Sequence, residues 1–301
     1  PLLAGIQVAA DDFGKIQFTL KSSTAGGTAF ISVSSVNGSA NGNTSVTMSN
    51  LNIISVSSIR TAVSQGQANV PVSVVVENLG SSTIANLSAG LIFKGPPPQN
   101  ENRNADFPNV VRTDGVTNIP GGSTRTLTFN ASVSATAKTD TVTIDSWISG
   151  QINTETVSDT FAVSKWKWAV QNPPQLRITK IHSLLDEVSQ GQTAINVSMF
   201  VENQGQANAN VTLDTLNFWS INTAKDVTGE YQIVPEQTNP PVILGDGSVH
   251  QFDFSVSVSS AATLGQVRID GRIFGTDATS GAPVSDVNAD TTLTWLVKNA
   301  P

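Results

Sequence analysis

The sequence predicts an all-β fold: tandem immunoglobulin-like antiparallel β-sandwich domains, with a partial repeat at the N-terminal end. The first observation is a repeat, since the segment Val-Ser-Gln-Gly-Gln at 63–67 recurs letter for letter at 188–192. The second is periodicity, because short runs of alternating apolar and polar residues are separated by Gly, Pro and Asn. Such alternation is typical of strands with one buried face, and no ten-residue window shows a capped stripe of helical period. Short strands with frequent turns favour a sandwich.

The repeat extends beyond this segment and divides the chain into units. The run Glu77-Asn78-x-Gly80 returns as Glu202-Asn203-x-Gly205, and Trp168 returns as Trp295 after a two-residue insertion behind Gly275. We therefore expect two sandwich domains, at 51–172 and 173–301, each long enough to bury its own core.

Residues 1–50 are predicted to be the C-terminal half of a further sandwich repeat. Ile16, Phe18 and Leu20 alternate with polar residues as the strand at 127–131 does, and Val36-x-Gly38 falls near the place of Ile148-x-Gly150. The chain also begins with Pro1 rather than Met, which favours a processed or excised piece.

Two pairs of runs are the strongest strand candidates. Residues 70–76 and 195–201 are rich in β-branched side chains, while 127–133 and 252–258 place Phe129 and Phe254 on their apolar faces. Each run alternates with period two, so each is expected to cover one side of a core.

Four glycines are predicted to serve as turn residues. Gly66 and Gly191 stand between strand-like runs, and Gly80 and Gly205 end the next strand. A tight turn needs a residue that accepts positive φ. A phosphate-binding loop would need a following helix N-terminus, and none is expected here.

Composition excludes several classes of protein. The net charge is −7, which argues against nucleic acid and against an anionic membrane surface. Only 13% of the residues are charged, so Ser, Thr, Asn and Gln must supply the polar surface, a balance typical of extracellular β proteins. There is no Cys, hence no disulfide and no Cys-ligated zinc. No apolar run is long enough to span a bilayer, so no membrane insertion is expected.

Residues able to catalyse are sparse, and we expect no enzyme and no cofactor. The two histidines, His182 and His250, are not repeated at matching positions, and no nucleophile elbow is present. Asp145 and Asp270 match between the repeats and are interpreted as carboxylates at strand edges or turns.

Two kinds of surface site remain as weaker hypotheses. Asp277, Asp286 and Asp290 cluster around a loop rich in Gly and Ser and are calcium candidates, without the spacing of an EF-hand. Six Asn-x-Ser/Thr sequences are glycosylation candidates: Asn37, Asn43, Asn86, Asn130, Asn196 and Asn210.

Tryptophans offer a third possibility for binding. Trp168 and Trp295 are expected to pack in a core or between domains, since they occupy matching places in the last strand of each repeat. Trp147 and Trp219 would suit a carbohydrate platform, although Arg272 replaces Trp147 in the second repeat.

The repeats resemble CARDB-type domains, the Ig-like or fibronectin-III-like modules of prokaryotic cell-surface proteins. The resemblance rests on an opening Leu-x-Ile strand, a turn ending in Gly-Gln, a Val-rich strand closing on Glu-Asn-x-Gly, and a Gly-rich turn before a Phe-containing strand. It covers 51–301, and loosely 14–50. It implies a seven-stranded sandwich with an adhesive or spacer role, and it carries no catalytic residues.

Three functions follow as hypotheses. The first is a non-enzymatic extracellular structural or adhesive protein at the cell surface: a stalk, adhesin or matrix component whose partners are copies of itself or neighbouring surface proteins. The second is a subunit of a filament or surface layer that assembles by strand complementation of the incomplete first repeat. The third is a carbohydrate-binding module of a secreted enzyme, with glycans as partners.

Overall fold

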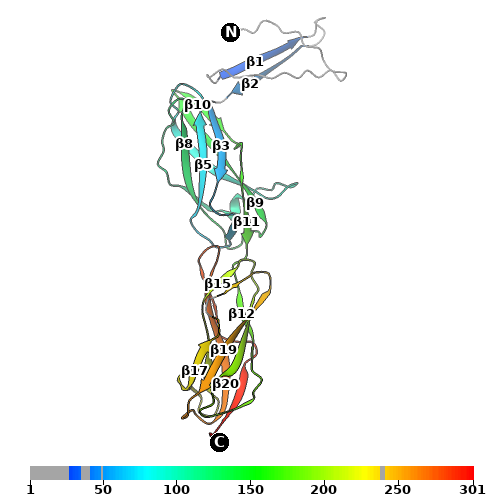
Figure 1. Ribbon diagram of the computed structural model, residues 1–301. Coiled ribbons are helices and arrows are strands. Elements are labelled where there is room, and N and C mark those ends of the chain that lie inside the picture. Colours follow the sequence, from blue (N-terminus) through cyan, green and yellow to red (C-terminus); the bar gives the residue numbers. More distant parts are fainter. Residues whose placement is uncertain (1–26, 35–40, 49, 238–240) are drawn as a thin grey trace.

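The computed structural model describes residues 27–34, 41–48, 50–237 and 241–301. Over this part of the chain the structure is all-β, with two short 3-10 turns and no α-helix, which confirms the predicted fold class. Two β-sandwiches follow one another end to end along the chain (Figure 1). We call them the first and the second sandwich.

The first sandwich has two sheets. One sheet has the strand order β3-β5-β8-β7, and the other has the order β10-β9-β11-β4 with β6 on the far edge of β9. The strands are β3 (Leu51–Ser57), β4 (Ala62–Ser64), β5 (Val70–Asn78), β6 (Ala85–Lys94), β7 (Asn109–Arg112), β8 (Thr124–Ser132), β9 (Thr141–Ile152), β10 (Glu155–Asp159) and β11 (Trp166–Gln171).

The second sandwich repeats this plan with extra short strands. One sheet runs β12-β14-β19-β17 and the other runs β13-β22-β20-β15-β16, with β18 on β15 and β21 on β20. The strands are β12 (Leu176–His182), β13 (Glu187–Ser189), β14 (Ile195–Asn203), β15 (Ala209–Ser220), β16 (Lys225–Asp226), β17 (Tyr231–Pro235), β18 (Val242–Ile243), β19 (Ser248–Val258), β20 (Gly265–Asp277), β21 (Pro283–Asp286) and β22 (Leu293–Lys298).

Both sandwiches begin with a strand that changes sheets. In the first, β3 pairs antiparallel with β5, and the chain then crosses over so that β4 pairs parallel with β11. In the second, β12 pairs with β14 and β13 pairs parallel with β22. An opening strand shared between two packed antiparallel sheets is a feature of Ig-like sandwiches, so the chain is built of Ig-like folds.

The predicted alternation correctly identifies the core. Strands β5 and β14 share the pattern of buried residues at every second position, and the apolar faces of β8 and β19 are buried as expected. Trp168 and Trp295 are fully buried in their own sandwiches, which confirms the core alternative for both.

Each core contains two stacked aromatic rings with a tryptophan tilted against them. Phe93 lies 3.9 Å from Phe107, and both rings lie about 6 Å from Trp168. In the second sandwich Phe218 stacks on Tyr231 at 3.9 Å and lies 5.9 Å from Trp295. The second member of each stack comes from a segment that the sequence alone left as a long loop without a role, 95–118 and 219–241; Phe107 follows a 3-10 turn there and Tyr231 begins β17.

Before the first sandwich, β1 (Gly27–Ser34) and β2 (Asn41–Met48) form an antiparallel pair of their own. The strand expected at 16–20 and the Val36-x-Gly38 match lie outside the described residues. The half-sandwich assigned to 1–50 therefore stays a prediction.

Candidate functional site

The repeated Val-Ser-Gln-Gly-Gln segment forms the same turn in both sandwiches. Gly66 has φ 76° and Gly191 has φ 75°, so each needs the conformational freedom of glycine. The Oε1 atom of Gln67 accepts a hydrogen bond from the N–H of Ser64 at 3.0 Å, and Gln192 repeats this with Ser189 at 2.9 Å. The assignment of Gly66 and Gly191 to turns is confirmed.

The turn of the first sandwich lies at the junction between the two sandwiches. The Nε2 atom of Gln67 donates to the carbonyl of Thr279, in the loop between β20 and β21, at 3.4 Å. The same loop contains the two-residue insertion that distinguishes the second repeat. A shallow hollow between the sandwiches is lined by Gln65, Gly66, Gln67, Ala68, Pro173, Asp277, Ser280, Gly281 and Ala282.

The linker is fixed to the second sandwich by hydrogen bonds. The carbonyl of Asn172 accepts from the N–H groups of Gln206 and Ala207, at 3.2 and 3.0 Å. The N–H of Asn172 donates to Oε1 of Gln206 at 3.0 Å. Pro173 and Pro174 follow, and proline fixes φ and stiffens a short linker. The linker is therefore held as part of the second sandwich.

Gly80 and Gly205 are required for a different reason from the one predicted. Positive φ is recorded for Gly66 and Gly191 but not for Gly80 or Gly205. A Cβ at Gly205 would lie 1.9 Å from the carbonyl oxygen of Pro173, and one at Gly80 would lie 2.8 Å from Nδ2 of Asn50. These glycines allow the preceding chain segment to pass closely, so the prediction of a φ requirement there was wrong.

The residue before each of these turns is a buried Asn that organises it. The side chain of Asn203 donates to the carbonyls of Ala207 and Ile243 and accepts from the N–H groups of Gly205 and Gln175. Asn78 makes the corresponding bonds to Ser82, Ile119 and Gly80. Their match between the repeats was visible in the sequence, but their role was missed.

A methyl group at Gly205 is expected to destabilise the second sandwich. Gly205→Ala places Cβ against the backbone of Pro173, which belongs to a tied linker and has little room to shift. The free energy of unfolding should fall by about 1–3 kcal/mol, measured by urea titration of the full chain. Gly229→Ala is the matched control, since nothing lies within 4 Å of a Cβ there. Equal stability of the two variants would contradict the close-approach explanation.

The three calcium candidates already have protein partners. Asp277 accepts from the N–H of Thr279 and the hydroxyl of Ser280, Asp286 from the N–H of Ile178, and Asp290 pairs with Arg177, each at 2.7 Å. Across the described parts of the chain, no group of three His, Cys, Asp or Glu side chains is placed to hold a metal. The cluster seen in the sequence is thus divided among three separate tasks.

Asp286 and its counterpart Asp159 stabilise the first strand of each sandwich. Asp159 accepts from the N–H of Ile53 and Asp286 from that of Ile178, both at 2.7 Å. Both N–H groups belong to strands whose pairing register shifts just beyond, between Ile53 and Ser55 and between Ile178 and Lys180. The carboxylates therefore satisfy backbone donors next to a bulge.

Asp145 and Asp270 were predicted to be carboxylates at strand edges or turns. The structure instead places them in the middle of β9 and β20. Asp145 is fully buried and accepts from the N–H groups of Ser146 and Ala162, at 2.9 and 2.8 Å. Asp270 does the same with Gly271 and Ala289, at 2.8 and 2.7 Å. Each holds the loop that crosses to the last strand.

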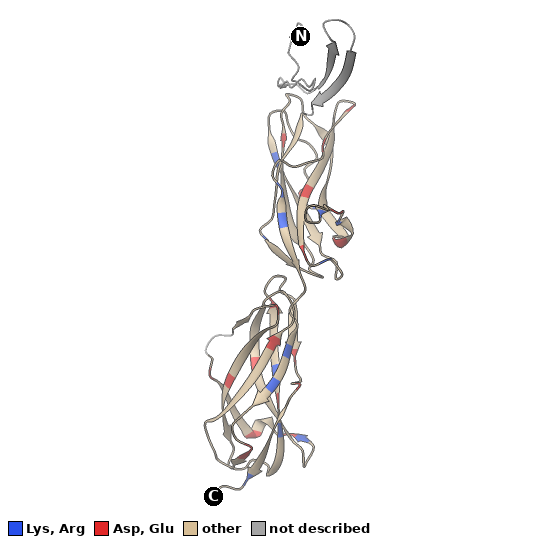
Figure 2. Cartoon of the chain, turned by 90° about the vertical axis from the view of Figure 1, so that its right-hand side faces the viewer, with Lys and Arg blue, Asp and Glu red and all other residues tan. Residues whose placement is uncertain are grey.

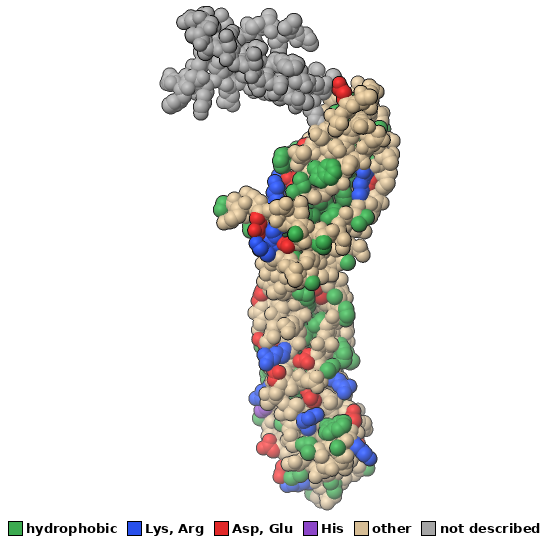
Figure 3. Space-filling model, turned by 180° about the vertical axis from the view of Figure 1, so that it is seen from behind, with side chains coloured by type: hydrophobic (Ala, Val, Ile, Leu, Met, Phe, Trp, Pro, Cys, Tyr) green, Lys and Arg blue, Asp and Glu red, His purple; other side chains and the backbone are tan. Residues whose placement is uncertain are grey.

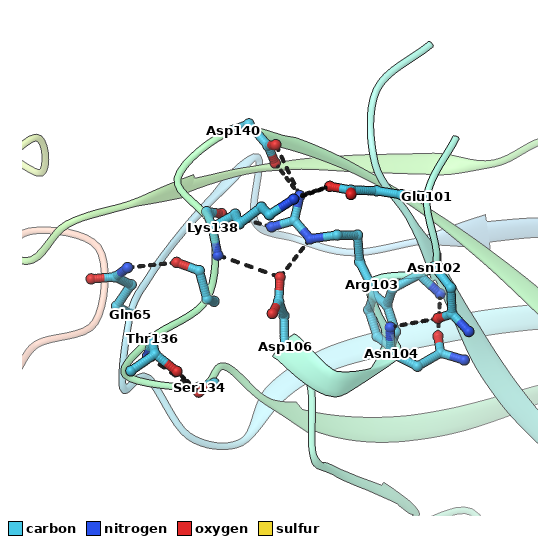
Figure 4. A network of polar contacts seen from close by, with 12 residues as sticks. Gln65, Glu101, Asn102, Arg103, Asn104, Asp106, Ser134, Thr136, Lys138 and Asp140 are labelled. Carbon is cyan, nitrogen blue, oxygen red and sulfur yellow. Dashed lines mark hydrogen bonds and ion pairs between the residues drawn. The ribbon is translucent and has the colours of Figure 1, made fainter. Parts of the chain in front are cut away.

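Arg103 is the centre of a polar network that the sequence did not indicate (Figure 4). Its buried guanidinium pairs with Asp106 at 2.5 Å and Asp140 at 2.7 Å, and donates to the carbonyl of Lys138 at 2.9 Å. Burial alone would lower the pKa of Arg103, but the hydrogen bonds to the two carboxylates outweigh it and raise the pKa. The network ties loop 95–108 to loop 134–140.

A second ion pair holds the loop after β7. Asp114 accepts from Arg112 at 2.8 Å, from the N–H of Val116 at 2.7 Å and from that of Thr128 at 2.9 Å. Burial would raise the pKa of this carboxyl, but these hydrogen bonds outweigh burial and lower the pKa below 3.8.

This lowered pKa predicts acid sensitivity. Because the folded pKa is below the unfolded one, the stabilisation by Asp114 is present above pH 3.8 and is lost as the pH falls through the folded pKa. Asp114→Asn should be less stable at neutral pH by about 1–3 kcal/mol and should lose less stability than the parent on acidification. Urea titrations over a pH series measure this, with exposed Glu155→Gln as control. Parallel pH profiles for parent and Asp114→Asn would contradict it.

The remaining candidate residues are spread over the surface. Asn86, Asn196 and Asn210 are exposed and Asn130 is half-buried, while Asn37 and the side chain of Asn43 lie outside the described residues. His182 and His250 stand on separate strands, and His250 packs edge-on against Phe252. Glycosylation stays a prediction.

Charged residues are scattered singly along the strands (Figure 2). No helix in the described residues is long and apolar enough to cross a membrane. The hollow at the junction contains one carboxylate, Asp277. Its two oxygens already accept hydrogen bonds from Thr279 and Ser280 of its own loop.

No family model matches this chain, and no curated protein matches it. Among solved structures, a protein of unknown function from Porphyromonas gingivalis W83 is 13% identical, with 84% of this chain and 100% of that chain covered and a TM-score of 0.26. The C-terminal domain of the Streptococcus agalactiae AgI/II polypeptide BspA is 9% identical, with 82% and 99% covered and a TM-score of 0.31. A marsupial T cell receptor is 9% identical, with 83% and 74% covered and a TM-score of 0.34. Likenesses this low carry no argument about function.

Proposed function

We propose that this chain is a non-enzymatic extracellular protein of the cell surface, built of CARDB-type domains, that acts as a stalk or adhesin. The observation that carries the proposal is the junction, where a short linker tied to the second sandwich holds two sandwiches in series. Such a chain keeps its ends apart, and spacing is what a stalk supplies. Its partners would be copies of itself or neighbouring surface proteins.

The strand arrangement supports a mechanical role. The chain enters each sandwich at one end and leaves at the other. The second strand of each sandwich, reached after the opening strand has changed sheets, pairs in parallel with the last strand, β4 with β11 and β13 with β22. A pull on the two ends loads these hydrogen bonds along the strands, so that they must break together rather than one by one. The bonds from the N–H of Gln65 to the carbonyl of Gln171 and from Gln190 to Lys298, both 2.9 Å, extend each pair.

This arrangement predicts that one proline weakens one sandwich mechanically. Gln65 precedes a glycine of positive φ in a four-residue turn, a position that favours proline. Gln65→Pro removes the N–H bonded to Gln171 while the turn geometry is kept. It also removes the side-chain amide that donates to the carbonyl of Ala137, and Gln65→Ala, which loses that amide alone, is the control. In single-molecule pulling of the full chain, the unfolding force of the first sandwich should fall and that of the second should not. Gln190→Pro should give the reverse, and unchanged forces in both variants would contradict the proposal that these strand pairs resist the pull.

Location is tested separately. Antibodies against the chain should label intact cells of the native host as strongly as permeabilised ones. Labelling that appears only after permeabilisation would overturn the surface proposal, whatever the pulling experiment shows.

A further inference from the structure

One outer sheet face of the first sandwich combines aromatic rings with lysines. In β6 and β9, Gly90 lies opposite Trp147 and Lys94 lies opposite Thr143, and in β11 Lys167 lies opposite the same Thr143. These positions alternate with the buried ones, so their side chains share the outer face. Together with Phe161 and Lys165 from the loop before β11, Trp147, Lys94 and Lys167 form what we call the aromatic–lysine face.

Trp147 packs directly over β6 because Gly90 beside it has no side chain. A Cβ at Gly90 would lie 2.7 Å from Nε1 of Trp147 and 3.0 Å from Cε2, so the indole rests directly on the strand. Trp147 is only half-buried. The accessible part of the indole offers a planar apolar surface to a ligand.

Lysines surround an exposed phenylalanine at the other end of the face. Phe161 is 58% exposed, and the ammonium groups of Lys94 and Lys165 lie 5.3 and 5.4 Å from its ring centre, within cation–π range. Lys165 also pairs with Asp145 at 2.7 Å. In the described structure neither Lys94 nor Lys167 has a carboxylate partner, so the face carries unbalanced positive charge on a chain of net charge −7.

The second sandwich lacks this combination at the matching positions. There Thr215 stands opposite Arg272, in the places of Gly90 and Trp147. Asn288 and Thr294 stand where the first sandwich has Phe161 and Lys167. The second sandwich thus keeps the same fold without these aromatic and lysine side chains. The fold by itself therefore does not require the aromatic–lysine face. Hydrophobic and Lys or Arg side chains lie near one another on the first sandwich in the view from behind (Figure 3).

We propose that the aromatic–lysine face binds an acidic polysaccharide, with a uronate ring stacked on Trp147 and carboxylates paired with Lys94 and Lys167. The C–H faces of sugar rings suit a flat indole, and carboxylates form charge-assisted hydrogen bonds with ammonium groups. Lys94 is four residues along β6 from Gly90, about 13 Å at the usual rise of a strand, so the face fits a polymer rather than one sugar. This site is independent of the stalk role proposed above.

The test is affinity electrophoresis of the full chain in gels containing polygalacturonate, alginate or neutral dextran. Migration should be retarded by the two uronate polymers, less so at high salt, and not by dextran. Absence of retardation by both uronate polymers would overturn the proposal. Equal retardation by dextran would overturn the assignment of an acidic ligand.

Variants locate the site. Trp147→Ala should weaken the affinity for polygalacturonate about tenfold, as loss of the stacking surface implies. Lys94→Gln with Lys167→Gln should weaken it and flatten its salt dependence. Trp219→Ala and Lys225→Gln, on the second sandwich, are matched controls and should bind as the parent does. Binding unchanged in both the Trp147 and the lysine variants would overturn the site, and circular dichroism melts verify that each variant is folded.

Discussion

Trp168→Ala is expected to destabilise the first sandwich by about 3–5 kcal/mol, one of the largest losses that a single core substitution gives. The indole is fully buried and packs against Phe93 and Phe107, so its removal leaves a cavity that the two stacked rings cannot fill without separating. Trp295→Ala should have the same effect on the second sandwich, where Phe218 is its neighbour.

Calorimetry of the full chain measures this, because two sandwiches that unfold separately give two transitions, and each substitution should move only its own. Trp219→Ala is the control, since Trp219 is partly exposed and its loss should cost much less. A shift of both transitions by Trp168→Ala would contradict the independence of the two cores.

Trp168→Phe should recover much of the loss. The Nε1 atom of Trp168 is buried and has no hydrogen-bond partner among the described residues, and the same holds for Trp295. Phenylalanine fills part of the space and also removes an unpaired donor, which otherwise costs free energy. If Trp168→Phe were as unstable as Trp168→Ala, the close packing of the indole would contribute more to the free energy of unfolding than the apolar area that the side chain buries.

The sequence predicted the core well because period-two alternation depends on local geometry. A strand of alternating Val residues has one buried face in any sandwich, so β5 and β14 could be read directly. Comparison of the two repeats added the turns at Gly66 and Gly191, since a positive φ is also a local property.

The same comparison could not identify contacts between distant segments. Phe107 and Tyr231 fill the same place beside Phe93 and Phe218. The segment from Phe93 to Phe107 is one residue longer than the segment from Phe218 to Tyr231. An alignment with a constant offset therefore does not pair Phe107 with Tyr231. Gly205 was interpreted as a turn residue because the approach of Pro173 is visible only in three dimensions.

The candidate sites show the same limit. Asp277, Asp286 and Asp290 are near in sequence and were grouped as calcium candidates, whereas their partners come from three different segments. Trp147 was noted as a possible platform, but the lysines that give its face a charge come from other strands and a loop. The two-residue insertion behind Gly275 was visible, yet its contact with Gln67 was not.

The Arg103 guanidinium has no cationic counterpart among the described residues of the second sandwich. The N–H of Arg103 donates to the carbonyl of Phe93, and the N–H of Val227 donates likewise to Phe218, both at 2.9 Å. A buried Val thus occupies the place of a buried Arg in an otherwise equivalent turn. The position tolerates an apolar side chain although Glu230 follows Val227 as Asp106 follows Arg103, because Gly265 stands in the place of the second carboxylate, Asp140.

Arg103→Met is therefore expected to destabilise the first sandwich by roughly 3 kcal/mol, because it leaves Asp106 and Asp140 facing one another without a cation. The partial exposure of both carboxylates keeps the loss at the low end of the range for a broken buried pair. The stability of Arg103→Lys should lie between those of the parent and of Arg103→Met. An ammonium group keeps the positive charge but lacks the planar guanidinium that reaches both carboxylates. The first transition in calorimetry gives the measurement, and exposed Arg125→Ala is the control.

A combined variant separates the two explanations for that loss. If unpaired carboxylates cause the destabilisation, the triple variant with Arg103→Met, Asp106→Asn and Asp140→Asn should be more stable than Arg103→Met alone. The two added substitutions remove the repulsion between the carboxylates and their uncompensated negative charge. If the guanidinium matters mainly by packing, the added substitutions should give no recovery or a further loss. Recovery would mean that Arg103 is needed because Asp106 and Asp140 face one another. In the second sandwich Glu230 stands in the place of Asp106 and accepts hydrogen bonds from Thr263, while Gly265 stands in the place of Asp140, so Val227 suffices there.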